Sequence, residues 1–310
     1  MSTAPLPRTR RYRPGHPVSV GAVLGVYRHG GGDPTFRRDD AGVWLGRHTP
    51  EGAGTLLVRV EPGGDIVGEA WGPGAGWLLD GLPALLGADD DWTGFVAHHR
   101  PVADARRAFP GWRMGRSRLV LDSLVPAVIE QKVTGKEAFA AYRRLVWTFG
   151  EPAPGPRESL RLAPTAAGWR GIPSWEYLAA GVTPQRSATV IRCAQVAGRL
   201  EDCVGMPLPA AHARLRAIPG VGEWTVAEVA QRALGDPDAP SFGDYHLAKE
   251  VGWALLGHDL DDDGLREILQ PYAGHRHRAA ALALMGGPAR PRRGPRFTLP
   301  THLPSGNRRR

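Results

Sequence analysis

Residues 215–230 read LRAIPGVGEWTVAEVA, and this stretch decides the fold. The pattern predicts one helix, a tight turn at Pro219, Gly220, Val221 and Gly222, and a second helix that begins at once. Glycines let a phosphate group approach the turn, because they carry no Cβ atom. The unpaired N–H groups at the start of the second helix, with the positive end of its dipole behind them, bind an anion without a lysine. The alternative is an ordinary helix–turn–helix corner, since Gly-x-Gly is common in turns, but the position between two helices favours DNA phosphate.

A carboxylate follows this turn at a useful distance. After a predicted helix at 224–234 and a loop at 235–240, residues 241–249 read SFGDYHLAK, with Asp244 at the start of the next helix. Taken alone, Asp244 is best interpreted as an N-cap, which aspartate fills well. Its position downstream of a phosphate-binding turn favours a catalytic role instead.

Two regions with different patterns flank residue 109. Gly42–Arg47, Thr55–Val60 and Asp65–Trp71 predict strands, as does the apolar, partly β-branched segment Pro17–Tyr27. Beyond 118, apolar residues at helical spacing alternate with Gly and Pro, which is typical of an orthogonal helical domain. We therefore expect a mainly α protein, with an all-α domain preceded by a small α+β domain. The expected divisions are a basic disordered arm at 1–16, the α+β domain at 17–108, the helical domain at 109–287 and a basic disordered tail at 288–310.

The composition is that of a globular protein, and its charge is unevenly placed. The net charge is +8, but eleven arginines lie before residue 14 or after residue 287, and the remaining chain is negative overall. Basic ends of this kind add salt-dependent phosphate affinity but are weak evidence for DNA binding on their own. Two cysteines cannot form a disulfide framework or a thiolate cluster, so we expect a reducing, cytoplasmic location and a buried Cys193. No apolar run approaches the length of a membrane span, and we expect a monomer without membrane contact.

Three stretches together resemble the helix–hairpin–helix (HhH-GPD) superfamily of DNA glycosylases, in particular its 3-methyladenine DNA glycosylase II (AlkA-type) branch. They are VIEQKVT at 128–134, IPGVGEWT at 218–225 and GDYHLAK at 243–249. They follow the family's order at about its spacing, and the similarity covers roughly residues 109–286. The resemblance implies damaged duplex DNA as the partner, excision of alkylated, 3-methyladenine-like purines and an abasic product.

The resemblance also implies roles for residues around the turn. Asp244 would stabilise the positive charge that builds up on the sugar, after the damaged nucleotide has rotated out of the duplex. Gln131 and Lys132 lie where the family has a side chain that fills the gap left in the DNA. Lysine cannot stack there as leucine does, although its ammonium group could pair with phosphate. Thr134, Thr225 and the turn itself complete the predicted DNA contacts.

Trp224 predicts the reaction type. Superfamily members that also cut the strand have a Schiff-base lysine at this position, and none of the three lysines of this chain matches it. We therefore expect a monofunctional enzyme. The resemblance implies a base pocket lined by Trp224 and Tyr245, with Glu228 and His275 where aromatic residues are expected. A free Glu228 carboxylate would attract a cationic base, whereas the alternative is a solvated helix face.

The resemblance implies no organic cofactor, and a monovalent cation (Na⁺ or K⁺) held by the backbone carbonyls of Arg216, Ile218 and Val221. An acidic stretch, DLDDDGLREILQ at 259–270, nearly matches a calcium loop, but its last position is glutamine and a capped helix start is favoured. Two other functions stay open: a non-catalytic binder of distorted DNA, and a glycosylase for oxidised or mispaired bases. The carboxylate of Asp244 argues against the binder, since a negative charge beside DNA costs affinity.

Overall fold

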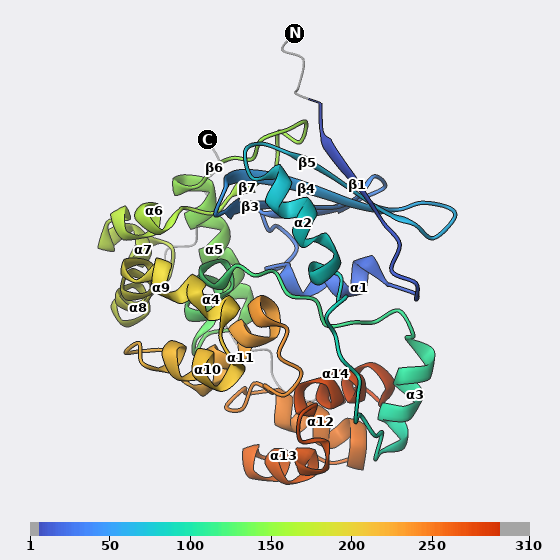
Figure 1. Ribbon diagram of the computed structural model, residues 1–310. Helices are drawn as coiled ribbons and strands as arrows, with labels where there is room; N and C mark the ends of the chain where they lie inside the picture. The colour runs from blue at the N-terminus through green and yellow to red at the C-terminus, as the bar shows by residue number, and fades with distance from the viewer. Residues whose placement is uncertain (1–5, 292–310) are drawn as a thin grey trace.

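A computed structural model describes residues 6–291 and begins with a five-stranded antiparallel sheet. The strands lie in the order β1-β5-β4-β3-β2, and helix α2 covers one face of the sheet (Figure 1). The register pairs Leu45 with Leu56 and Leu56 with Ala70, so apolar side chains of neighbouring strands meet on the face of the sheet that packs against α2. The elements are β1 Arg8–Tyr12, β2 Phe36–Asp39, β3 Gly42–Thr49, β4 Gly52–Val60, β5 Ile66–Trp71 and α2 Ala75–Leu85.

Two predictions for the N-terminal region are wrong. The arm expected to be disordered contains β1, an edge strand whose register on β5 is supported by ion pairs of Arg11 with Glu61 and Asp65. The segment Pro17–Tyr27, expected as a strand, forms helix α1 (Val20–Leu24) and a 3-10 turn (Gly25–Tyr27). Of the predicted C-terminal tail, residues 292–310 lie outside the described residues, and Arg290 pairs with Asp259.

The rest of the described chain is helical, apart from the short pair β6 (Glu151–Pro152) and β7 (Arg161–Leu162). The helix predicted at 224–234 is present as α11 with its π-helical extension. The α-helices are α3 Arg100–Ala108, α4 Val120–Glu130, α5 Gly135–Phe149, α6 Ala166–Gly171, α7 Ser174–Ala179, α8 Pro184–Gln195, α9 Ala197–Glu201, α10 Leu208–Arg216, α11 Glu223–Val229, α12 Leu247–Leu256, α13 Asp262–Leu269 and α14 Arg276–Gly286. A π-helical turn, Ala230–Leu234, extends α11, and 3-10 turns lie at Asp202–Gly205 and Gln270–Tyr272.

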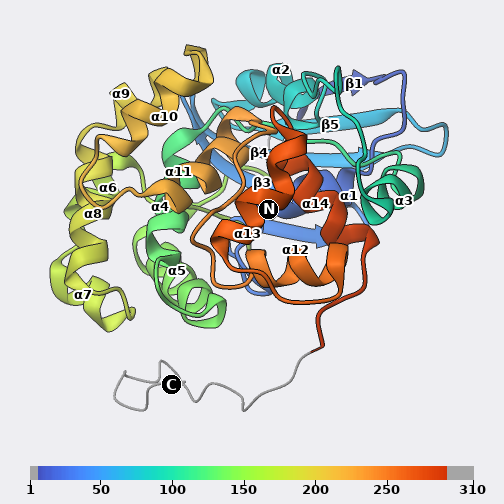
Figure 2. The same cartoon turned by 90° about the horizontal axis from the view of Figure 1, so that it is seen from below.

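These helices form two groups, each around its own apolar core. Helices α4–α11 enclose one core, and α3 with α12–α14 encloses the other (Figures 1 and 2). Helix α3 lies before residue 109, in the part predicted as the α+β domain, yet its buried Val102 and Ala105 pack with the C-terminal group. None of the described helices is long and apolar enough to cross a membrane.

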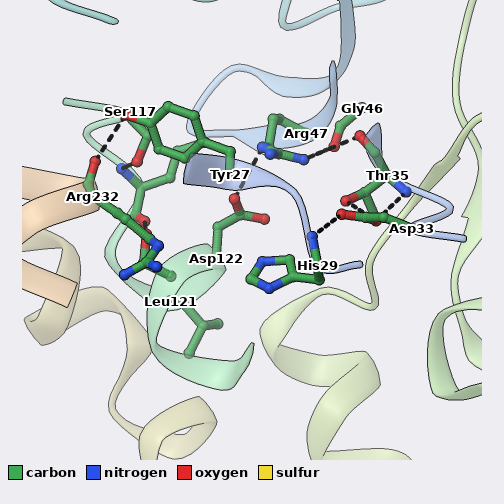
Figure 3. A network of polar contacts seen from close by, with 12 residues as sticks. Tyr27, His29, Asp33, Thr35, Gly46, Arg47, Ser117, Leu121, Asp122 and Arg232 are labelled. Atoms are coloured by element: carbon green, nitrogen blue, oxygen red, sulfur yellow. Dashed lines mark hydrogen bonds and ion pairs between the residues drawn. The ribbon is translucent and has the colours of Figure 1, made fainter. Parts of the chain in front are cut away.

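A polar network joins the sheet to the helices (Figure 3). Arg47 of β3, 5% exposed, forms an ion pair of 3.0 Å with Asp122 of α4 and donates hydrogen bonds to the carbonyls of Gly46 and Thr35. Burial lowers the pKa of Arg47, but the nearby carboxylates, first that of Asp122, raise it by more. The Tyr27 hydroxyl donates to the Arg232 carbonyl at 3.1 Å. Breaking either half of a buried pair is costly, so this network fixes the sheet against α4 and α11.

Candidate functional site

The turn between α10 and α11 has two glycines that differ in conformation. Gly220 has a φ of +97°, and a Cβ added there would lie 2.2 Å from Oγ1 of Thr189. Gly222 is extended, at φ −95° and ψ −176°, and a Cβ there would meet no atom within 4 Å. Gly220 is therefore required by the fold of the turn, whereas Gly222 leaves open space in front of the first turn of α11.

Two side chains donate hydrogen bonds to backbone carbonyls of the turn. The Gln131 amide donates to the Gly220 carbonyl at 2.9 Å and to Oγ1 of Thr225 at 2.8 Å, and the Arg192 guanidinium donates to the Pro219 carbonyl at 3.2 Å. The structure thus brings Gln131 and Thr225 to the turn, but their polar groups bind each other and Thr225 is buried. In this structure both residues shape the turn, and their DNA contact stays a prediction.

Lys132 and Thr134 lie in the connection between α4 and α5. Lys132 is exposed and has a φ of +55°, a left-handed conformation that costs energy for a residue with a Cβ atom. Thr134 caps α5 in a reciprocal pair with Glu137: its side chain accepts from the Glu137 amide, and the Glu137 carboxylate accepts from the Thr134 hydroxyl and amide. Lys132 is therefore held outward beside the hairpin, while the hydroxyl of Thr134 is used within the protein.

Asp244 lies three residues before Leu247, the first residue of α12, so the helix begins slightly later than predicted, and both carboxylate oxygens of Asp244 are bound. Oδ1 accepts from the amides of His246 and Leu247 at 2.8 and 2.9 Å, and so caps the helix. Oδ2 accepts from the indole nitrogen of Trp224 at 3.1 Å. These three bonds fix the direction of a partly exposed carboxylate beside the hairpin, which is the arrangement that electrostatic stabilisation of a sugar cation requires.

Glu228 lies one turn after Trp224, and its environment corrects the expectation from the sequence. Its carboxylate is 13% exposed, accepts from the Ser241 hydroxyl at 2.5 Å, and pairs with Arg232 at 2.7 Å. It is therefore neither a free charge for a cationic base nor a solvated side chain. Arg232 is not among the expected site residues, although its spacing four residues beyond Glu228 is the pattern of a helical ion pair.

Tyr245 and His275 contact residues other than Trp224, Glu228 and Asp244. Tyr245 is 71% exposed, and the ammonium nitrogen of Lys249 lies 3.8 Å from the centre of its ring. His275 contacts the Thr93 carbonyl through Nε2 at 3.0 Å and Arg278 through Nδ1. The described contacts join Trp224, Glu228 and Asp244 into one cluster; they do not join His275 to it.

His277, which is not among the expected site residues, lies near Arg232 of the extension of α11. Burial, followed by the positive charge of Arg232, lowers its pKa to about 4, although Asp236 raises it. The imidazole is therefore neutral at pH 7. A lone histidine in a helical pattern gives no sequence signal for such an environment.

The carbonyls expected to hold a cation lie around the turn. The Ile218 carbonyl accepts from the Val221 amide at 3.0 Å and keeps its second lone pair for another partner. Oxygen ligands of this kind suit Na⁺ or K⁺, so the residues fit the predicted ion. Within residues 6–291, no cluster of three or more His, Cys, Asp or Glu side chains could hold a metal ion, and Asp261 caps α13 in the stretch that nearly matches a calcium loop.

The chain is similar to known DNA repair proteins. No family model matches it. Among curated proteins, it is 30% identical over 184 residues to a "Probable bifunctional transcriptional activator/DNA repair enzyme AlkA" of Mycobacterium tuberculosis, a match that covers 56% of this chain and 34% of that protein. The matched part thus spans about a third of the length of this relative.

Solved structures share the fold at low identity. A 3-methyladenine DNA glycosylase from Archaeoglobus fulgidus superposes with a TM-score of 0.70 at 17% identity, over 89% of this chain and 97% of that one. The 8-oxoguanine glycosylase/lyase of Clostridium acetobutylicum, solved with double-stranded DNA containing cytosine opposite 8-oxoG, gives 0.67 at 11% identity, over 91% and 97%. These solved structures confirm the fold that the resemblance of the three motifs implies.

Proposed function

We propose that this chain, which has the fold of the helix–hairpin–helix DNA glycosylases, flips a damaged base out of duplex DNA and cleaves its N-glycosidic bond. The observation that carries the proposal is the Asp244 carboxylate, fixed beside the hairpin by the indole of Trp224 and by two amides of α12. A non-catalytic binder would have no use for a partly exposed negative charge held at this position.

The reaction builds positive charge on the sugar as the base leaves. A fixed carboxylate stabilises that charge without reorganising, and it can orient or activate the attacking water. The hairpin turn would bind a phosphate of the flipped nucleotide's strand at Gly222, where a Cβ atom would meet open space. We infer that a Na⁺ or K⁺ ion held by carbonyls of Arg216, Ile218 and Val221 would add positive charge at the same phosphate.

The product should be an intact abasic site. Strand cleavage by β-elimination needs an amine nucleophile, and α11 carries Trp224 at the position next to Asp244. Lys249, the lysine closest in sequence to Asp244, has its nitrogen on the ring of Tyr245.

Alkylated purines are the proposed substrates. The ring of Trp224 can stack on a cationic base and attract it by about 0.5–2 kcal/mol. Because Arg232 neutralises Glu228, the Glu228 carboxylate adds little to this attraction. The same neutral pair favours a second candidate, an uncharged oxidised or deaminated purine.

The test is a panel of duplexes, each with one 7-methylguanine, hypoxanthine or 8-oxoguanine, and an undamaged control. Released base is measured by chromatography, and strand integrity is measured with and without alkali. The proposal expects base release from at least one lesion and strand breaks only after alkali. Breaks without alkali would contradict the monofunctional assignment, and tight binding with no base release would support the binder.

A further inference from the structure

One face of α11 and its π-helical extension runs from the hairpin to the N-terminal domain through Trp224, Glu228 and Arg232. These residues are four apart and follow one another along the helix. They contact three segments far apart in the sequence, and they connect the carboxylate of Asp244 to the 3-10 turn after α1.

Arg232 joins this face to the N-terminal domain. Its Nε donates to the Val26 carbonyl at 3.0 Å, and its own carbonyl accepts from the Tyr27 hydroxyl and from the Ser117 amide (Figure 3). Its Nη1 donates to the Glu228 carboxylate at 2.7 Å and to the Glu228 carbonyl at 3.0 Å. The guanidinium is 24% exposed, so water screens the pair only in part.

Glu228 also binds the segment that carries Asp244. Its second oxygen accepts from the hydroxyl of Ser241, a residue that is 7% exposed, and the Ser241 hydroxyl also accepts from the Gln231 amide at 2.9 Å. The Ser241 carbonyl then accepts from the Asp244 amide at 3.2 Å.

The segment 241–244 is thus held at both ends by α11: Glu228 binds Ser241, and Trp224 binds Asp244. Only the Trp224 contact touches the reacting carboxylate. A shift of about 1 Å in a reacting group can cost about 100-fold in rate. A change in the Glu228–Ser241 hydrogen bond can therefore alter the rate of the chemical step, even though neither residue takes part in the reaction.

We propose that Glu228 and Arg232 are positioning residues, which couple the docking of the N-terminal domain at Val26 to the placement of Asp244. This inference rests on the proposed glycosylase activity. It gives the partly buried ion pair a role at the position where the family resemblance implies an aromatic pocket wall. Loss of the pair should leave DNA binding intact and lower the rate of the chemical step.

The experiment compares wild type, Glu228→Ala, Glu228→Gln, Ser241→Ala and Arg232→Met. Glu176→Gln is the matched control, because Glu176 forms a Glu–Arg pair with Arg144 between α7 and α5, away from α11. The single-turnover rate at saturating enzyme measures chemistry, and the Kd for undamaged DNA measures binding. We expect a loss of about 100-fold in rate for Glu228→Ala, less for Glu228→Gln, and a Kd within threefold of wild type. Adding Arg232→Met to Glu228→Ala should cause little further loss.

A second measurement does not depend on activity. Hydrogen exchange of the Asp244 amide and of the Trp224 indole N–H should accelerate in Ser241→Ala, which removes one hydroxyl. Thermal unfolding checks that this variant is folded at the temperature of the exchange experiment. Unchanged hydrogen exchange in Ser241→Ala would overturn the positioning role. If wild type is active, a single-turnover rate of Glu228→Ala equal to that of wild type would overturn it as well. A wild type that releases no base would instead count against the proposed function, and exchange would still decide the inference.

Discussion

Gly220→Ala should destabilise the protein, whereas Gly222→Ala should leave its stability nearly unchanged and weaken its binding to DNA. The two positions lie two residues apart in one turn and receive the same added methyl group. They differ in backbone conformation and in surroundings, with φ +97° and a close neighbour at Gly220, and φ −95° and open space at Gly222.

The magnitudes follow from this geometry. At Gly220, a left-handed alanine costs about 1–3 kcal/mol. The added Cβ also lies 2.2 Å from Oγ1 of Thr189, which donates to the Gln185 carbonyl, so moving it sacrifices a hydrogen bond of about 1 kcal/mol. We therefore expect a loss of about 2–4 kcal/mol in the free energy of unfolding. At Gly222, a weaker N-cap costs up to about 1 kcal/mol, and the lower entropy of the unfolded chain offsets about 0.4–1 kcal/mol of it.

Urea unfolding measures the stabilities, and fluorescence anisotropy with a labelled duplex at several salt concentrations measures the affinities. Gly198→Ala is the control, because a Cβ there also meets no atom within 4 Å and Gly198 belongs to α9 and not to the turn. We expect Gly222→Ala to lose about tenfold in affinity, equivalent to about 1.4 kcal/mol, and Gly198→Ala to lose none. DNA affinity equal to wild type in Gly222→Ala at every salt concentration would refute the phosphate site at the turn. A stability change below about 0.5 kcal/mol in Gly220→Ala would refute the steric reasoning.

Three further predictions concern stability. Glu201→Gln should cost about 1–2 kcal/mol in urea unfolding, because the buried Glu201 carboxylate accepts the first two amides of α4 at 2.8 Å and glutamine offers one acceptor oxygen; equal stability would contradict this capping role. Gln131→Ala should cost about 1–2 kcal/mol through its two lost bonds to the turn, and an unchanged unfolding midpoint would show that the turn holds without them. His277 binds a proton below about pH 6.5 in the unfolded chain but only below about pH 4 in the folded one, so its contribution to stability falls as the pH decreases through that window, by up to about 3 kcal/mol. Urea titrations from pH 4 to 7 should therefore show a shallower decline for His277→Gln, and parallel curves would argue against a buried neutral imidazole.

Local patterns predicted the elements that are fixed locally. The strands β3, β4 and β5 are short, largely buried runs between turns, and the hairpin and the cap at Asp244 follow from residues within one or two turns of each other. Pro17–Tyr27 forms a helix and a 3-10 turn because Val20, Val23, Leu24 and Tyr27 follow a helical period and are buried, and this spacing outweighs the β-branched content that predicts a strand. The arginine-rich β1 resembled a disordered arm, since its pairing with Asp65 and β5 becomes visible only in three dimensions.

The residues of the candidate site also divide into those that local patterns predict and those that depend on long-range contacts. Trp224, Glu228 and Asp244 lie within 21 residues of each other, and the structure brings them together. Arg232 bonds to Val26 and His275 to Thr93 across separations of 206 and 182 residues, which no local pattern encodes. The sequence therefore predicted the carboxylate and the turn, but not which side chains of the expected pocket are occupied by other partners.

The most direct test of the central claim is single-turnover base release by wild type and by Asp244→Asn on the duplex that wild type cleaves best. Asparagine keeps an oxygen that can accept from the two amides of α12, so the variant should fold and bind DNA while it lacks the negative charge. The account predicts loss of base release by at least about 100-fold, with a DNA affinity equal to or higher than that of wild type because a negative charge beside DNA is removed. Base release by Asp244→Asn at the wild-type rate would show that this carboxylate is only a helix cap, and that the catalytic group lies elsewhere.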